Sequence, residues 1–573
     1  MPENRVVPRL ALLAAVVLTI GGLIAAVGGA GAADPSKGTV SLDERSSGWD
    51  GESYPVGSTV ARDACALPTD TVCDHFELNV DIDPAHWETN KGGVEVRIAW
   101  ESEADDFDLT VYDEDFNEVG SSLNPGTTSE RVFINDASGT YFVEINPYQV
   151  TDSAYQGGAF VESRAIVGPE GGDVPTEPVS GLDCVDGLAG PFPCENVDLA
   201  SFLPLDSIGG GQGNDIWGWT DPETGREYAL MGKTSGTAFV DITDAEAPVY
   251  LGDLPSHQPV ETIFNVWRDV KVYENHAFVV SEEPLHGMQV FDLTRLRGVS
   301  EPRTWTEDAH YSYTLDGPTS VVELGPDPTR LRTLDNAHNI AINEDSGFAY
   351  AIGTSTCGGG GPHMIDIRDP KDPKFAGCVS EDGYTHDTQC VNYDGPDERF
   401  HGREICLSSN EDTLTIADVT DKSNPVQLAR ETYPGASYTH QGWLTEDGSH
   451  FLVDDELDEV DEQVEQTTTY IWNVEFLDAP RLVAAHPGES TSIDHNLYTK
   501  GDTVFQANYR SGLRVLDASS AAAGELTETG FFDVYPADDE PEFNGAWSNF
   551  PYYESGVVVV SGIEQGLFVL RPR

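Results

Sequence analysis

From about residue 65 to residue 165, short stretches of the chain alternate apolar and polar positions. They lie at residues 76–80, 94–98, 107–112, 131–134 and 141–145. Alternation with a period of two places one face of a strand on a core and the other in water. Turns rich in acidic residues, Ser and Gly separate the stretches. We therefore predict a small β-sandwich over residues 65–165.

A repeat runs from Cys184 to Arg573. Each unit begins with a polar pair and an apolar strand, and continues with a second strand, a polar loop and a strand that ends in a carboxylate. The seven pairs begin at Asn214, Arg268, His338, His386, His440, His495 and Ser548, and their second residues are 48 to 70 residues apart. This spacing suits a four-stranded blade with long loops. The prediction is an all-β chain with a seven-bladed β-propeller over residues 184–573.

The seventh repeat is one strand short. After the strand that follows Ser548, only two apolar stretches remain, at residues 557–560 and 567–570. Residues 196–203 have strand character and precede the first repeat. We expect them to supply the missing outer strand, which closes the ring and joins its two ends.

The remaining segments show no such periodicity. Residues 34–64 and 166–183 are rich in Gly, Ser, Pro and acidic residues and are predicted to be exposed linkers. Residues 1–33 combine two arginines, an apolar run over 10–27 and small residues before Asp34, which predicts a secretory signal peptide. An uncleaved N-terminal membrane anchor is the alternative, and it is the only membrane contact that we expect.

Export agrees with the cysteines and with the charge. Eight cysteines fall as the neighbours Cys65/Cys73, Cys184/Cys194, Cys357/Cys378 and Cys390/Cys406, and we interpret them as disulfides, although eight cysteines allow 105 connectivities. The net charge of −68 is spread along the whole chain, so nucleic acid is not an expected partner. Charge repulsion of this size destabilises a compact state unless salt screens it, which suggests adaptation to high salt.

The predicted sandwich resembles a known domain family. Asp105-Asp106-Phe107-Asp108-Leu109, the turn at 113–115 and Ser138-Gly139-Thr140-Tyr141 resemble the bacterial pre-peptidase C-terminal domain, a small β-sandwich found in many secreted proteins. Its acidic residues suit calcium, which takes several oxygen ligands. Solvated turn carboxylates are the alternative explanation.

The repeats resemble the choice-of-anchor B family with LVIVD-type propeller repeats. The resemblance is carried by Asn214-Asp215-Ile216-Trp217-Gly218-Trp219, Gly287-Met288-Gln289-Val290-Phe291-Asp292, Tyr438-Thr439-His440-Gln441-Gly442-Trp443 and Asp494-His495-Asn496. It implies an exported surface protein with no established enzymatic activity. This chain ends at the last repeat, without the C-terminal apolar segment of anchored members.

Candidate chemistry is concentrated in the polar pairs. His338, His386, His440 and His495 begin four consecutive repeats, so a propeller would bring them together at its axis. Glu411, Asp455 and Glu456 end second strands and are expected on the same face. Imidazoles with carboxylates suit a divalent transition metal, Zn, Fe, Cu or Mn. Alternatively, each histidine braces a turn through a buried hydrogen bond.

Two functions follow from these observations. The first is a secreted or cell-surface binding or scaffold protein without catalysis, whose partner is an extracellular protein or a glycan. The second is a metal-dependent enzyme with its site at the propeller axis. Propellers host both functions, so the fold cannot decide between them. We find no nucleophile elbow, zinc-protease helix or phosphate-binding loop in the required context.

Overall fold

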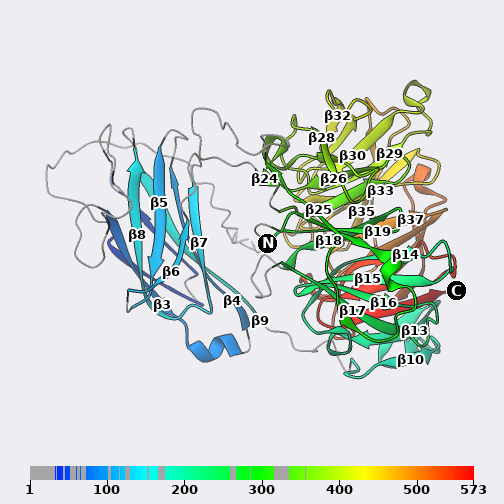
Figure 1. Ribbon diagram of the computed structural model, residues 1–573, viewed down its shortest axis with the longest axis horizontal. Helices are drawn as coiled ribbons and strands as arrows, with labels where there is room; N and C mark the ends of the chain where they lie inside the picture. The colour runs from blue at the N-terminus through cyan, green and yellow to red at the C-terminus, as the bar shows by residue number, and fades with distance from the viewer. Residues whose placement is uncertain are drawn as a thin grey trace, which may run out of the picture. The chain divides into compact units, whose positions relative to one another are not determined.

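The computed structural model describes residues 33, 35–42, 45–51, 54, 60, 65, 73–88, 90–100, 105–114, 116–122, 129–150, 154–165, 174–257, 266–283, 286–314, 333–334, 336–354 and 356–573. Strands dominate these residues, as predicted (Figure 1). The chain divides into two compact units, Met1–Ile166 and Val167–Arg573. Among the described residues no helix is both long and apolar enough to cross a membrane, and residues 1–32 of the predicted signal segment lie outside them.

The first unit contains two sheets that share one hydrophobic core. The core includes Trp49, Phe76, Val96, Phe107 and Val143, all buried. One sheet has the strand order β1-β3-β8-β5-β6 and the other β2-β9-β4-β7. The strands are β1 (Lys37–Ser41), β2 (Ser46–Asp50), β3 (Asp74–Asp81), β4 (Asn90–Trp100), β5 (Asp106–Tyr112), β6 (Glu118–Ser122), β7 (Ser129–Asn135), β8 (Gly139–Gln149) and β9 (Tyr155–Ala165), with a 3₁₀ turn at Pro84–Glu88.

Both predicted linkers contain strands, so their boundaries were wrong. In residues 34–64, β1 pairs in parallel with β3 and β2 pairs with β9. In residues 166–183, of which 166–173 lie outside the described residues, β10 (Val179–Leu182) pairs with a strand of the second unit. β1 and β2 each bury a single apolar residue, Val40 or Trp49. One apolar residue gives no periodicity, so the strands could not be recognised from the sequence.

In the described part of the second unit, the strands form seven sheets of four or more strands and one short ribbon. Pairing within the sheets is antiparallel, except that β21 joins β17 in parallel. Sheet 1 contains β14 (Gly213–Thr220), β15 (Glu227–Lys233), β16 (Gly236–Asp241), β17 (Val249–Pro255) and β21 (Arg303–Thr304). Sheet 2 contains β18 (Arg268–Tyr273), β19 (His276–Ser281), β20 (Met288–Asp292) and β22 (Ala309–Tyr311). Sheet 3 contains β25 (Asn339–Asn343), β26 (Phe348–Ile352), β27 (His363–Asp366) and β28 (Lys374–Cys378). The ribbon is β23 (Tyr313–Thr314) with β24 (Thr333–Leu334).

Sheets 4 to 7 continue the same pattern. Sheet 4 contains β29 (Asp387–Asn392), β30 (Glu404–Ser409), β31 (Leu414–Asp418) and β32 (Val426–Glu431), and sheet 5 contains β33 (Thr439–Leu444), β34 (His450–Asp455), β35 (Thr468–Asn473) and β36 (Arg481–Pro487). Sheet 6 contains β37 (Asn496–Lys500), β38 (Thr503–Ala507), β39 (Leu513–Asp517) and β40 (Thr527–Phe532), extended by β12 (Phe192–Glu195) and β11 (Leu188–Ala189). Sheet 7 contains β41 (Ala546–Phe550), β42 (Val558–Gly562), β43 (Gly566–Pro572) and β13 (Val197–Pro204), extended by β10. The only α-helical segment among the described residues is α1 (Cys357–Gly360), and short 3₁₀ turns lie at Leu205–Ile208, Leu293–Leu296, Glu398–Phe400 and Ala521–Ala523.

The first strands of the seven sheets contact one another in sequence order. β14 contacts β18, and the series continues through β25, β29, β33 and β37 to β41, which contacts β14 again. A cycle of inner strands with the later strands of each sheet arranged outward is the architecture of a β-propeller. Every polar pair singled out in the sequence lies in, or immediately before, one of these first strands.

The seventh sheet takes its fourth strand from the start of the unit, as predicted. β13 pairs with β43 over seven residue pairs from Val197–Pro572 to Pro204–Gly566, and the C-terminus lies beside β13 (Figure 1). Phe192, Phe202 and Phe568 pack together in the core there. The two ends of the repeat region are therefore held together by strand pairing and by buried aromatic rings.

The four disulfides join sequence neighbours, as the simplest pairing predicts. They are Cys65–Cys73, Cys184–Cys194, Cys357–Cys378 and Cys390–Cys406. The last of these joins opposed positions of the adjacent strands β29 and β30. No described cysteine is free. Such a set is typical of proteins that fold in an oxidising compartment.

Candidate functional site

The four predicted histidines come together because they begin neighbouring inner strands. His338, His386 and His495 immediately precede β25, β29 and β37, and His440 is the second residue of β33. Their ring centroids follow one another at 4.4, 4.1 and 4.4 Å. We call this group the axial histidines.

Two of the axial histidines, both buried, form hydrogen bonds to the backbone of the next sheet. Nδ1 of His386 donates to the carbonyl oxygen of His440, 2.9 Å away in the next sheet. Nδ1 of His495 donates in the same way to the carbonyl of Trp547. A carbonyl accepts only, so Nδ1 carries the proton and Nε2 keeps its lone pair in these two neutral rings. Bracing therefore leaves a metal-binding nitrogen available on each ring.

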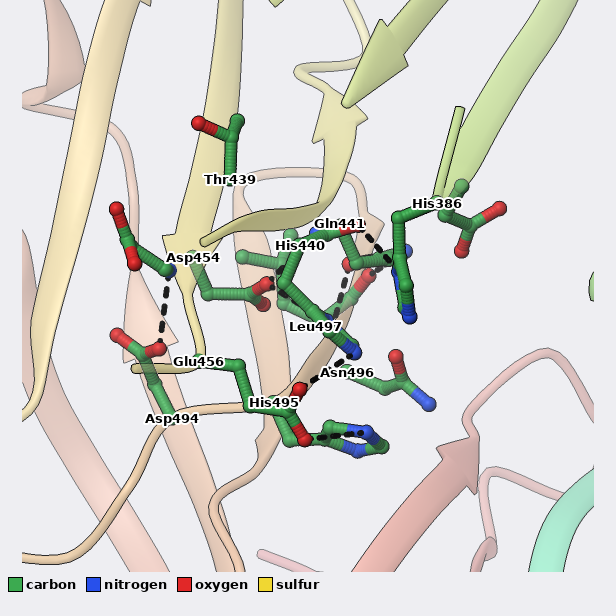
Figure 2. Close-up of polar contacts among 12 residues, drawn as sticks. His386, Thr439, His440, Gln441, Asp454, Glu456, Asp494, His495, Asn496 and Leu497 are labelled. Atoms are coloured by element: carbon green, nitrogen blue, oxygen red, sulfur yellow. Dashed lines mark hydrogen bonds and ion pairs between the residues drawn. The ribbon is translucent and has the colours of Figure 1, made fainter. Parts of the chain in front are cut away.

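Glu456 lies between two of these rings, as Figure 2 shows. Its Oε2 is 3.7 Å from Nε2 of His440 and its Oε1 is 3.6 Å from Nε2 of His495. The Tyr509 hydroxyl donates to Oε1 at 2.6 Å. Asp454 approaches the other nitrogen of His440, with Oδ1 3.4 Å from Nδ1. One donor atom each from His440, Glu456 and His495 lies within 4.8 Å of the other two.

Burial sets the protonation states of this group. Loss of hydration lowers the pKa of His386 and His440 well below that of a free imidazole, and the neighbouring rings lower it further. Burial lowers the pKa of His495 to about 3 and raises the pKa of Glu456 to about 7. Burial also lowers the pKa of His338, but its hydrogen bond with Glu282 outweighs this and the pKa is raised. Three neutral imidazoles therefore face one another, in the protonation state that metals bind.

Two predicted carboxylates are placed elsewhere. Asp455 accepts hydrogen bonds from the Tyr433 hydroxyl at 2.7 Å and from the backbone N–H groups of Ser437 and Tyr438 at 2.9 and 2.6 Å. Glu411, at a φ of 61°, pairs through its backbone with Thr439. Neither belongs to the group of His440, Glu456 and His495. Asp455 thus fastens the loop that leads into β33.

The other three sheets replace histidine with Asn214, Arg268 and Ser548. Arg268 is fully buried, and its guanidinium lies 3.7 Å from Oε2 of Glu283 and donates to the Ser256 hydroxyl at 2.6 Å. Its charge is therefore already paired within the propeller. Tyr509 could not be recognised as a site residue from the sequence, because its only signal is its place after Asn508 at the end of a second strand.

The acidic residues of the first unit do not form a comparable group. Asp105, Asp106 and Asp108 are buried at the start of β5, whereas Asp113 accepts from the backbone and side-chain nitrogens of Asn117 within a turn. Asp115, which the calcium prediction included, lies outside the described residues. Among the described residues, the clusters with metal-ligand spacing all lie in the second unit.

A pocket of about 600 Å³ opens toward the other end of the inner strands. All seven first strands contribute to it, and its aromatic residues include Trp217, Trp443, Tyr498 and Tyr552. Lys271 reaches it from β18, with its ammonium group 4.6 Å from the Trp217 ring and 3.3 Å from Asp215. Aromatic faces beside polar groups are typical of small-ligand sites.

Comparison with known proteins gives no family for this chain. No family model matches it, and no curated protein does. Among solved structures, the computationally designed Ika8 protein matches at 10% identity and a TM-score of 0.38, over 68% of this chain and 99% of that one. The β-propeller domain of Cps50 (Swd1) from Myceliophteria thermophila matches at 10% identity and a TM-score of 0.38, over 64% and 98% of the two chains.

Proposed function

We propose that this chain is an exported binding protein without catalytic activity, built on a seven-bladed propeller whose axis holds a divalent transition metal. The seven sheets and their closed cycle of inner strands support the blade count. The first unit, with two sheets over one core, supports the resemblance to a pre-peptidase C-terminal sandwich. Four disulfides support export. The choice-of-anchor B resemblance agrees with such a role.

One observation carries the metal proposal: one ligand atom each from His440, Glu456 and His495 converges at the axis. Nε2 of His495 keeps its lone pair because Nδ1 donates its proton to the carbonyl of Trp547. This Nε2 lies 3.6 Å from Oε1 of Glu456. Nε2 of His440 faces the same carboxylate at 3.7 Å. A divalent cation satisfies all three groups at once, and two imidazoles with one carboxylate are an established zinc donor set. Backbone carbonyls on Nδ1 would orient the rings, as outer partners do in metal sites.

Burial favours binding over turnover. His386, His440 and His495 are each 3% exposed or less, so an ion held there would have little access to a substrate. Such an ion would tie sheet 5 to sheet 6 and reinforce the propeller. A metal-dependent enzyme, the second function that the sequence suggested, requires an open coordination position that a substrate can reach.

We expect the mature full-length protein, purified without a His tag, to contain about one zinc ion per chain by mass spectrometry. Replacing His440→Ala together with His495→Ala should remove that zinc and lower the melting temperature. The matched control is His401→Ala, because His401 is exposed and lies outside the axial group, beside the Gly395 carbonyl, the Asp394 carboxylate and the Tyr393 ring. A folded, metal-free parent that takes up no added Zn, Fe, Cu or Mn would show that the histidines are braces alone.

The pocket at the other end of the inner strands favours a saccharide as the binding partner. Sugars stack on aromatic faces and bond to nearby polar groups, and Trp443 and Tyr552 are the partly exposed aromatic side chains there. We expect soluble polysaccharides such as xylan, laminarin or dextran to retard the protein in native affinity gels. Trp443→Ala should abolish most of that retardation, whereas Phe476→Ala, which alters an exposed aromatic residue on another surface, should preserve it. Unchanged mobility in every polysaccharide would contradict this proposal.

A further inference from the structure

Three carboxylates meet in a buried cluster next to the axial site. Asp458 and Glu459 lie in the loop between β34 and β35, and Asp494 lies just before β37 in the next sheet. One oxygen of each lies within 4.8 Å of an oxygen of the other two. All three residues are buried, with Asp458 and Asp494 at 0% exposure and Glu459 at 6%. We call them the acidic triad.

The triad has more acceptor oxygens than donors to satisfy them. Asp494 accepts from the backbone N–H groups of Asp455 at 3.1 Å and Thr468 at 3.2 Å. Asp458 accepts from the Tyr470 hydroxyl at 2.7 Å through Oδ2. The buried Oδ1 of Asp458 and both oxygens of Glu459 receive no hydrogen bond from any described residue. No lysine, arginine or histidine in the described part of the chain forms an ion pair with the triad.

Burying three carboxylates without compensation is costly, because a charge in a poorly polarisable interior loses its hydration. A single proton shared between Asp458 and Glu459 would relieve only that pair and would still leave an oxygen of Glu459 without a partner. Burial and the neighbouring carboxylates also raise the pKa of Asp494 well above its ordinary value, so its charge too is costly while no cation is present. A cation between the three carboxylates would compensate their charges and give Glu459 the partner that it lacks.

We propose that the acidic triad is a calcium site. Calcium takes six to eight oxygen ligands, binds carboxylates through one or both oxygens, and does not require nitrogen or sulfur. The site would join the loop after β34 to the start of β37. Glu456 precedes Asp458 by two residues and Asp494 precedes His495 directly, so the ion would fix two segments that carry axial ligands. This proposal goes beyond the axial metal and does not depend on it.

The test uses the full-length protein after dialysis against a chelator. About one calcium ion per chain should rebind, and the melting temperature should rise by several degrees on calcium addition. Terbium in the same site should luminesce when tyrosine is excited, because the Tyr470 hydroxyl lies 2.7 Å from Asp458. Glu459→Gln and Asp494→Asn should each weaken calcium binding at least tenfold. Glu462→Gln, which alters an exposed carboxylate of the same loop, is the matched control and should bind like the parent.

Each outcome decides the proposal. Calcium or terbium binding that the triad variants retain would place the ion elsewhere and overturn it. A chelated parent whose melting temperature does not change when calcium is added would also overturn it. In that case, a Glu459→Gln variant that melts at a higher temperature than the parent would show that the cluster is protonated. If a triad variant fails to fold, the calcium titration of the parent alone gives the answer. The His440→Ala, His495→Ala variant should still bind calcium, which separates this site from the axial one.

Discussion

Deletion of residues 184–205 is expected to leave the rest of the second unit without a cooperative fold. The deletion removes β13, which supplies the fourth strand of sheet 7, and β12, which extends sheet 6. It also removes Phe192 and Phe202 from a core that includes Phe568. The propeller would then have an unpaired edge on β43 and a gap in its ring. We expect near-UV circular dichroism to be lost and calorimetry to show no sharp transition for this unit.

A single substitution tests the same closure more finely. Phe202→Asp puts a charge into a fully buried position of β13, which should cost at least about 3 to 5 kcal/mol of unfolding free energy. Val249→Asp is the matched control, because Val249 lies on the outer strand β17 and is 39% exposed. The melting temperature of the Val249→Asp variant should stay within a few degrees of that of the parent. A deletion variant that stays soluble and melts cooperatively would refute closure by β13.

Unfolding should depend strongly on salt, with the protein far more stable at about 3 M NaCl than at about 0.05 M. The chain carries a net charge of −68. Its scarce cations are already used locally, for example Arg297 with Asp221 and Arg399 with Asp397. The surplus carboxylates therefore repel one another, and this repulsion falls as the Debye length shrinks to about 3 Å at 1 M salt. We expect the melting temperature to rise by at least about 10 °C across this range.

A charge variant separates screening from other effects of salt. Glu431, Glu489 and Glu525 are exposed, and replacing all three with lysine changes the net charge by about +6 without touching a described ion pair. The variant should gain stability mainly at low salt, where repulsion is strongest, and little at high salt. Equal stability of the parent at both salt concentrations would show that the acidic composition is not an adaptation to salt.

The repeat, its closure by residues 196–203 and the convergence of the histidines could be predicted from the pattern of residues along the chain. This information is local, because strand alternation, blade-length spacing and neighbouring cysteines can each be recognised within one stretch of chain. β13 was identified because the seventh repeat lacked a strand. The sequence did not reveal three other strands, β1, β2 and β10, because each is short and poor in apolar residues. They form strands by pairing with β3, β9 and β13, respectively.

The carboxylates that meet the histidines could not be selected without the packed propeller. Asp454, Asp455 and Glu456 are consecutive, and alternation along an extended chain directs neighbouring side chains to opposite sides. Glu456 therefore reaches His440 and His495, whereas Asp455 binds the loop before β33. The acidic triad could not be predicted from the sequence either, because its members come from two sheets. The packing of one sheet on the next brings Asp494 to Asp458 and Glu459. Contacts between sheets depend on the whole ring, and no single repeat encodes them.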